Sequence, residues 1–458
     1  MYNKKRFTIS FKKEFILRRI LVLFFIFTTS AMSFSCIANV GFLSPSGVSK
    51  NFADKVNFAM INVYNEEQLR ENLEIAKDNN LTLLLDLGPS LNTSKSSNDI
   101  KMTYHDSINA KNEKLLLPLN KNKLRKLPSD SDLLSTINRY MPLIKQYNKN
   151  ISAIFLADEP YLNGLDKEDL EKVAGITRTI LNNNGLSQIK LGVIFASAMF
   201  NKDFASKFDA KSGDYVKSID SHYQEISNRV KENTASTDEK EWLDIIKNNR
   251  LTTYDSAGNI YTKGGIPKGF DIYTFDFYLS TILLDQLYND IPNWLAAQGL
   301  DKACTAFNGK TIKDLRSELS FFKAGPMNTS ESDIKNDKTI LDQLYFCRMS
   351  TVTKLLQKEI TSSAPNSEIV IISESSSNGV MEFDPEGNIK TAQPEKLIEL
   401  RVLEEVQRAK EFYVESKTKN ISGLMFFLYN NEYDKTIKIN IGGAASMPSV
   451  LSEIYSTN

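Results

Sequence analysis

Histidine, cysteine and tryptophan are scarce in this chain of 458 residues, which has two, three and two of them. Cys36, Cys304 and Cys347 lie too far apart for a zinc motif, and His105 and His222 do not complete one. The sequence also has no Gly-x-Ser-x-Gly segment of the kind that presents a nucleophilic serine. We therefore expect no metal centre, no cofactor and no serine-hydrolase chemistry.

Excess charge of either sign is absent as well, because 56 basic residues balance 56 acidic ones. No basic stripe with interleaved aromatic residues occurs, which argues against nucleic acid as a partner. The content of 41% hydrophobic and 10% aromatic residues is typical of a globular protein with a large core.

The N-terminus has the pattern of an export signal. Residues 1–19 hold seven basic residues and one acid, and an apolar run over residues 20–28 and small residues around 30–38 follow. The apolar run is too short for a comfortable membrane span, although an uncleaved anchor is the alternative. We expect residues 1–35 to be a signal peptide or lipoprotein leader. Its removal leaves 49 basic and 55 acidic residues.

Cys36 follows Ser33-Phe-Ser, which faintly resembles a bacterial lipobox, so membrane attachment through lipid on Cys36 is one outcome and ordinary cleavage the other. Cys304 and Cys347 then remain as a pair. An exported protein can keep a disulfide, so they either form one or are two unrelated thiols.

Eight short apolar runs follow the leader, and most are continuous rather than alternating, as is typical of parallel strands covered on both faces. Helical patterns lie between many of them, such as the one that begins at Asn65 and ends near Lys77. This order predicts a (β/α)8 TIM barrel. The predicted strands are Asn39–Leu43, Phe58–Asn62, Thr82–Asp86, Ile151–Ala157, Lys190–Ala196, Asp271–Phe275, Glu368–Ser373 and Ile421–Leu428.

The chain is long for such a barrel, and three polar stretches hold the surplus, at residues 89–126, 199–269 and 297–336. We expect them to be long insertions in the loops after strands three, five and six, where loops commonly build a cleft or a lid. No linker separates a second domain. Residues 36–458 are therefore expected to form one domain.

Two acidic motifs follow predicted strands and carry the functional hypothesis. Ala157-Asp-Glu-Pro160 ends the fourth strand, and Ser373-Glu-Ser375 ends the seventh. Carboxylates at the carboxyl ends of two barrel strands can flank a glycosidic bond, one as acid/base and the other as nucleophile. Each glutamate read alone could also be a solvated loop residue.

The two motifs resemble those of the retaining (β/α)8 glycoside hydrolases grouped as the 4/7 clan. The resemblance implies that Glu159 is the general acid/base and Glu374 the nucleophile. Asp158 stands where that clan has Asn, and the eighth strand ends in Tyr429-Asn-Asn431 rather than in Trp. These departures favour a divergent member. They also keep open the alternative of a catalytically inactive barrel that binds glycan or a surface protein.

Other polar and aromatic residues lie at or near strand ends, where they could hydrogen-bond hydroxyls or stack on sugar rings. Asp86 could equally cap the turn that follows it. The tyrosines could equally be ordinary packing residues, since the chain has 18 of them. The expected substrate-binding residues are Asp158, Tyr161, Asp86, Tyr273, Asp276, Tyr429 and Asn430. The sequence as a whole predicts an exported, secreted or envelope-attached glycosidase with a carbohydrate substrate.

Overall fold

The computed structural model describes the chain from residue 39 onward, with gaps. The described residues are 39–94, 125–161, 165–196, 198–202, 224–237, 239–240, 243, 264–276, 309–310, 312–320, 323, 330–377, 395–416, 421–434 and 439–456. Residues 1–38, with the expected leader and Cys36, lie outside this description. No helix among the described residues is long and apolar enough to cross a membrane.

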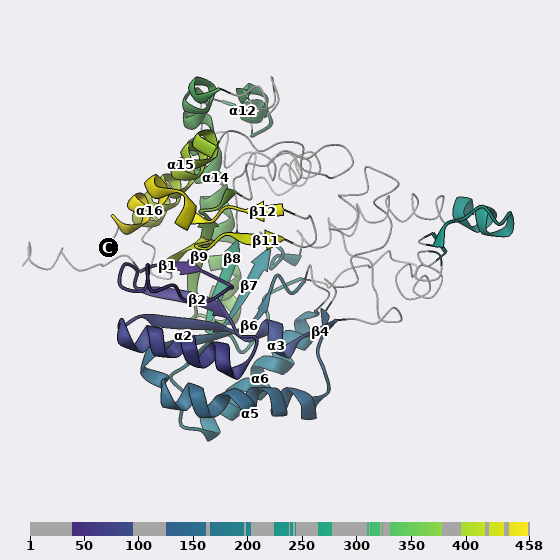
Figure 1. Ribbon diagram of the computed structural model, residues 1–458, viewed down its shortest axis with the longest axis vertical. Helices are drawn as coiled ribbons and strands as arrows, with labels where there is room; N and C mark the ends of the chain where they lie inside the picture. The colour runs from purple at the N-terminus through teal and green to yellow at the C-terminus, as the bar shows by residue number, and fades with distance from the viewer. Residues whose placement is uncertain are drawn as a thin grey trace, which may run out of the picture. The chain divides into compact units, whose positions relative to one another are not determined.

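Eight parallel strands close into a barrel in the order β1-β10-β9-β8-β7-β6-β3-β2 (Figure 1). The prediction of a (β/α)8 barrel is therefore confirmed, and each strand coincides with one of the eight apolar runs. The strands are β1 (Val40–Leu43), β2 (Phe58–Asn62), β3 (Thr82–Asp86), β6 (Ile151–Asp158), β7 (Lys190–Ala196), β8 (Ile272–Asp276), β9 (Glu368–Glu374) and β10 (Ile421–Phe427).

Alternate side chains of these strands fill the barrel interior, because successive residues of a strand point to opposite faces. The interior is largely apolar, with Phe155 and Met425 among its fully buried members, and Thr274 of β8 is a buried polar residue that pairs with Ile194 and Val370 of this core. Gly192 makes room for Phe155, since a Cβ at that glycine would approach the Phe155 ring to 2.5 Å. Burial of this layer from water is the main source of stability of the barrel. The interior core consists of Leu43, Phe58, Met60, Leu84, Ala153, Phe155, Ile194, Ile272, Val370, Ile372 and Met425.

Helices lie outside the strands, and their starts follow capping chemistry. Asn65 caps α2 by accepting the Gln68 N–H at 2.9 Å, as its sequence signal predicts. Ser129 accepts the Asp132 N–H at the start of α5. The long helices are α2 (Glu66–Asp78), α5 (Asp130–Gln146), α6 (Lys167–Asn183), α14 (Glu331–Ser363) and α15 (Glu395–Glu415).

Smaller elements complete the described chain. They are α3 (Gly88–Leu91), β4 (Thr93–Ser94), β5 (Arg125–Lys126), η4 (Asn148–Asn150), α12 (Ile312–Glu318), β11 (Glu432–Asp434), β12 (Ile439–Ile441), η7 (Ala444–Ser446) and α16 (Pro448–Tyr455). β4 pairs with β5, and β11 pairs with β12. Most of residues 89–126, 199–269 and 297–336 lie outside the described ranges, so the insertions after strands three, five and six stay a prediction.

Helices α14 and α15 enclose buried ionic groups. Arg408 on α15 is 1% exposed and binds Glu405 at 2.9 Å and Asp342 of α14 at 3.2 Å. Burial of these charged groups costs desolvation free energy, and their hydrogen bonds offset that cost. The cluster therefore determines how the two helices pack more than it adds to the stability of the fold. Cys347 on α14 is disulfide-bonded, and its partner lies outside the described residues. A bond to Cys304 stays a prediction.

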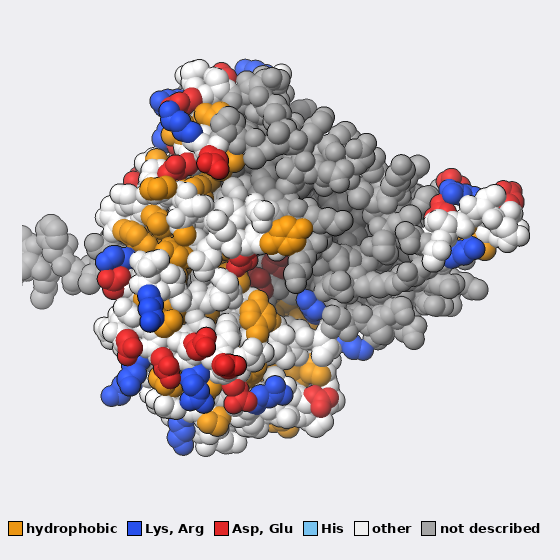
Figure 2. All heavy atoms as spheres, viewed as in Figure 1, with side chains coloured by type: hydrophobic (Ala, Val, Ile, Leu, Met, Phe, Trp, Pro, Cys, Tyr) orange, Lys and Arg blue, Asp and Glu red, His pale blue; other side chains and the backbone are white. Residues whose placement is uncertain are grey.

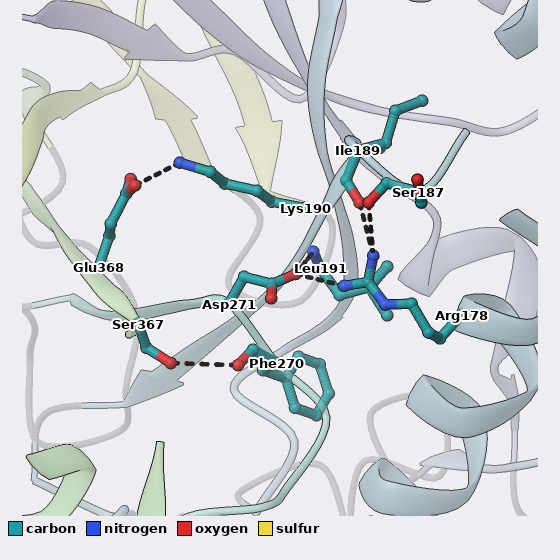
Figure 3. Close-up of polar contacts among 9 residues, drawn as sticks. All are labelled: Arg178, Ser187, Ile189, Lys190, Leu191, Phe270, Asp271, Ser367 and Glu368. Carbon is teal, nitrogen blue, oxygen red and sulfur yellow. Dashed lines mark hydrogen bonds and ion pairs between the residues drawn. The ribbon is translucent and has the colours of Figure 1, made fainter. Parts of the chain in front are cut away.

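The amino-terminal end of the barrel is held by paired charges (Figure 3). Asp271, just before β8, accepts hydrogen bonds from the Arg178 guanidinium and from the Leu191 N–H, the latter at 2.8 Å. Arg178 also donates to the Ile189 carbonyl at 2.9 Å. Lys190 at the start of β7 pairs with Glu368 at the start of β9. These contacts tie α6 to the starts of β7 and β8, and β7 to β9, and each acid has a basic partner.

Candidate active site

A pocket of about 230 Å³ opens at the carboxyl ends of the barrel strands. In (β/α)8 enzymes this end carries the active site. Figure 2 shows acidic side chains in a hollow between hydrophobic ones on this face of the molecule. None of the described residues that line the pocket is Lys, Arg or His. The lining consists of Leu43, Pro45, Met60, Asn62, Asp86, Asp158, Glu159, Ile194, Asp276, Ile372 and Phe427.

An irregularity in β6 brings its terminal acids to this pocket. The pairing with β7 runs from Phe155 opposite Gly192 to Asp158 opposite Ile194, so β6 holds one extra residue between them. Such a bulge reverses which side chains face inward. It places Asp158 beside Ile194, whose side chain belongs to the interior core.

Glu159 itself has a strained backbone. Its φ of 44° lies in the left-handed region, which few residues other than glycine adopt. Pro160 follows it and restricts the preceding residue further toward extended conformations. The hydrogen bond from the Glu159 N–H to the Ile194 carbonyl, at 3.0 Å, holds this geometry. Strain of this kind persists where the surrounding structure enforces it, and it is concentrated at functional sites.

Asp86 ends β3 beside Asn62 of β2 and Phe155 of β6. It is 2% exposed and lines the pocket. Its Oδ1 accepts a hydrogen bond from the Gly88 N–H at 2.8 Å. Asp86 therefore also caps the turn that follows β3, which was the alternative interpretation of this residue. Burial raises the pKa of Asp86 to about 7, and the Gly88 hydrogen bond opposes this shift. The carboxyl is therefore half protonated near neutral pH.

Asp158 and Asp276 complete the acidic lining of the pocket. The side chain of Asp158 opens into the cavity, and its pKa is raised well above the ordinary value. Desolvation is the largest cause, and the charges of Glu159 and Asp86 add to it. Asp276 ends β8 and lines the same cavity. Among the described residues, no group of three or more His, Cys, Asp or Glu side chains is arranged to hold a metal ion.

Glu374 ends β9 two residues after Ile372, which lines the pocket, and it pairs with Phe427, which also does. Strand alternation gives Glu374 the same face as Ile372. The carboxyl is nevertheless only 3% exposed and is not part of the lining. The Ser376 hydroxyl donates to its Oε1, while Oε2 has no hydrogen-bond partner.

The electrostatic state of Glu374 follows from this burial. Desolvation, with a smaller contribution from the Glu405 charge, raises the pKa of Glu374 to about 8, against the Ser376 hydrogen bond. The Glu374 carboxyl is consequently protonated, and so uncharged, at neutral pH. The two glutamates expected to act together thus differ: Glu159 lies in the cavity, and Glu374 lies covered beside it.

The three tyrosines expected to stack on sugars lie in the packing instead. Tyr161 and Tyr273 are at most 1% exposed, and their hydroxyls donate to the Gly265 and Pro267 carbonyls. Tyr429 is 4% exposed and packs edge-on against Phe42 and Phe52. None of the three lines the pocket. Tyrosines near strand ends were indistinguishable, by sequence, from those that pack between strands and helices.

Asn430 lies beside a second hollow, of about 500 Å³, together with Ser46, Asn431, Ala445 and Ser446. Its side-chain amide donates to the Ser46 hydroxyl at 3.0 Å. Pro45 lines the first pocket and Ser46 the second, so consecutive residues after β1 serve both.

Two lining residues with a polar or aromatic side chain, Asn62 and Phe427, were not among the site residues expected from the sequence. Phe427 ends β10 and gives the pocket an aromatic surface, which the sequence predicted at Tyr429 instead. Its position could have been found by counting inward positions by twos from Met425. Asn62 is the polar last residue of the apolar run of β2, and that change from apolar to polar was the signal.

No protein-family model and no curated protein matches this sequence. Solved structures similar to it include the cellulose synthase subunit Z of Clostridioides difficile, with 11% identity, a TM-score of 0.33, and coverage of 91% of this chain and 99% of that one. Another is the GH53 catalytic domain of Ignisphaera aggregans, with 10% identity, a TM-score of 0.34, and coverage of 92% and 95%.

A third is Cel5A of Thermotoga maritima, solved with cellobiose, with 10% identity, a TM-score of 0.36, and coverage of 91% and 97%. The similar solved structures also include glycoside hydrolases of families 39 and 5, at 8% and 9% identity. The barrel itself is established by the strand pairing of this chain.

Proposed function

We propose that this protein is an exported glycoside hydrolase that cleaves a polysaccharide or glycan by a retaining, two-carboxylate mechanism. The observation that carries the proposal is Glu159, held with a strained backbone in an acid-lined cavity at the carboxyl end of a closed barrel. Its motif and its place after the fourth barrel strand support the role of general acid/base.

In this mechanism Glu159 protonates the glycosidic oxygen while Glu374 attacks the anomeric carbon, which forms a glycosyl ester and releases the leaving group. Glu159 then takes a proton from water, and the water hydrolyses the ester. Retention requires carboxyl groups about 5–5.5 Å apart at the time of attack. Asp158, Asp86, Asp276 and Asn62 would bind the sugar hydroxyls.

Glu374 must lose its proton before it can attack. Because its pKa is about 8, the reactive fraction increases as the pH rises toward 8 and above. We therefore expect kcat/KM on dinitrophenyl glycosides, whose leaving group needs no protonation, to rise through about pH 8. A profile on these substrates that is flat from pH 5 to 9 would contradict the assignment of Glu374.

Substitution of each glutamate separates the two roles. Glu374→Ala should abolish turnover of every substrate, since no ester forms. Glu159→Ala should lose about 10²- to 10⁴-fold on poor leaving groups but retain activity on dinitrophenyl glycosides, with partial rescue by azide. Glu368→Gln, at the opposite end of the barrel, is the matched control. Equal losses in both folded variants on all substrates would refute these roles.

A catalytically inactive barrel that binds glycan is the second candidate, and the covered position of Glu374 favours it. In that case no glycoside is turned over at any pH, and glycans bind wild type and Glu374→Ala equally well.

Export is tested separately. Mature protein from its native host should begin between Ser33 and Asn39, or carry lipid on Cys36, as determined by mass spectrometry. An intact Met1 terminus on cytoplasmic protein would contradict it.

A further inference from the structure

The second hollow at this end of the barrel differs in chemistry from the acid-lined pocket. It measures about 500 Å³ and is lined by Ser46, Asn430, Asn431, Ala445 and Ser446. Its described lining has amides and hydroxyls and no acidic or basic side chain, whereas four carboxyl groups line the first pocket. The second hollow is therefore suited to an uncharged, polar ligand.

The fold builds this hollow from the chain after β1, the chain after β10, and η7. The first two meet because β1 and β10 are neighbouring strands of the barrel. Gly443 lets the start of η7 approach the end of β10, since a Cβ at Gly443 would lie 2.4 Å from the Tyr429 and Asn430 carbonyl oxygens. The Ala445 N–H donates to the Tyr429 carbonyl at 2.9 Å. Backbone contacts thus hold the lining in place.

The polar side chains of the hollow are each oriented by a contact within the protein. The Asn430 amide donates to the Ser46 hydroxyl at 3.0 Å, and Asn431 Oδ1 accepts the Gly443 N–H at 2.9 Å. The Ser446 hydroxyl donates to the Gly443 carbonyl at 2.8 Å. No described residue uses the Asn430 carbonyl oxygen or the Asn431 amide hydrogens. The hollow therefore offers both acceptors and donors whose directions are already set.

Sugar hydroxyls match such a lining, because each of them both donates and accepts hydrogen bonds. An aromatic ring is also at hand. Tyr433 of β11 comes two residues after Asn431 and is 55% exposed, unlike the three buried tyrosines that were expected to stack on sugars. An exposed ring of this kind can pack on the apolar face of a sugar and keep its hydroxyl in water.

The two hollows adjoin through consecutive residues, since Pro45 lines the first and Ser46 the second. The first, at about 230 Å³, is smaller than the roughly 300 Å³ at which sites for drug-sized ligands begin, so it fits a single sugar ring. The second has room for further rings. A chain of sugars with one unit in the first pocket can therefore continue into the second hollow.

We propose that the second hollow is a further sugar-binding subsite, which holds the neighbouring uncharged units of a glycan chain whose reacting unit occupies the acid-lined pocket. This inference rests on the proposed function for the view that the first pocket binds a glycan. It adds that the substrate is an uncharged oligosaccharide or polysaccharide rather than a single sugar on a non-sugar group.

The dependence of affinity on chain length tests the inference. The probes are oligomers of glucose, mannose and xylose with one to six units, beside oligogalacturonates as charged chains. Affinity is measured by calorimetry and ligand-observed NMR on mature protein that carries Glu159→Gln, so that the chains stay intact. Turnover of the same oligomers is measured on the protein without that change.

We expect at least one uncharged series to bind about ten-fold more tightly once its chain is long enough to reach the second hollow, as one or two added hydrogen bonds imply. Asn431→Asp keeps the acceptor for the Gly443 N–H but removes both amide donors, and it should abolish most of this gain. Ala445→Leu fills part of the hollow and should do the same. Asn51→Asp, an exposed change of the same kind between β1 and β2, should leave the gain intact.

Three results overturn the inference. They are affinity that does not increase with chain length in any uncharged series, an increase that survives both substitutions in the hollow, and tighter binding of oligogalacturonates than of every uncharged series. Thermal unfolding of each variant establishes that it is folded.

The same measurements let the two proposals fail separately. Turnover that depends on Glu159 but not on chain length sustains the hydrolase and refutes the second subsite. Binding that strengthens with chain length and is lost in Asn431→Asp, without turnover of any glycan, sustains the subsite and refutes the hydrolase.

Discussion

The two ends of the barrel treat acidic residues in opposite ways. At the amino-terminal end Asp271 pairs with Arg178 and Glu368 with Lys190, so each charge is compensated where the strands begin. At the carboxyl end Asp86, Asp158, Glu159 and Asp276 gather in one cavity that no described basic residue lines. The pairs at the first end hold the strands and helix together, whereas at the second the charges of Glu159 and Asp86, after desolvation, help to raise the pKa of Asp158. Under the proposed function, stability and ligand binding are thus assigned to different ends of one scaffold.

The largest expected effect is the decrease in unfolding free energy that the buried Asp86 carboxyl causes as the pH rises. The pKa of Asp86 is about 7 in the folded chain and 3.8 ordinarily, so the folded state holds this proton more tightly than the unfolded state. This contribution is fully present below pH 4, and it is lost as the pH rises from about 4 to 7. The loss amounts to about 4 kcal/mol, an upper bound at the scale of 1.36 kcal/mol per pKa unit.

Urea unfolding at pH 4 to 8 measures this loss. In Asp86→Asn the decrease in unfolding free energy over that range should become smaller, because the titrating group is gone and the Gly88 N–H keeps its acceptor. Glu74→Gln on exposed α2 should follow the wild-type curve. Identical pH dependence in Asp86→Asn and wild type would show that Asp86 is not held protonated.

The amino-terminal end should respond to a different change. Asp271→Ala leaves the Leu191 N–H and the Arg178 guanidinium without their shared acceptor, which should cost about 2 kcal/mol of unfolding free energy. Glu368→Gln removes a half-exposed pair and should cost below about 1 kcal/mol. Thermal and urea unfolding measure both. Ligand affinity should be unchanged in both variants. A large loss of affinity in either variant would contradict the separation of stability and ligand binding between the two ends of the barrel.

The smallest expected effect lies at Glu374. The Ser376 hydroxyl lowers the pKa of this carboxyl, so Ser376→Ala should raise it and displace the rise of kcat/KM on dinitrophenyl glycosides toward higher pH by roughly one unit. Ser375→Ala is the neighbouring control, since its hydroxyl donates to the Leu428 carbonyl instead. A profile that does not move would remove Ser376 from the control of Glu374.

The sequence by itself determined the barrel, because eight continuous apolar runs separated by helical patterns have few other ways to bury both faces of each strand. It also located Asp86, Asp158, Glu159 and Asp276, since polar residues that follow apolar runs lie at strand ends. Only the tertiary structure decided which strand-end residues meet in the pocket. The extra residue in β6 turns Asp158 inward, and neighbouring side chains cover Glu374 and pack around Tyr161, Tyr273 and Tyr429. Register and burial arise from contacts between residues far apart in the chain, and no local pattern encodes them.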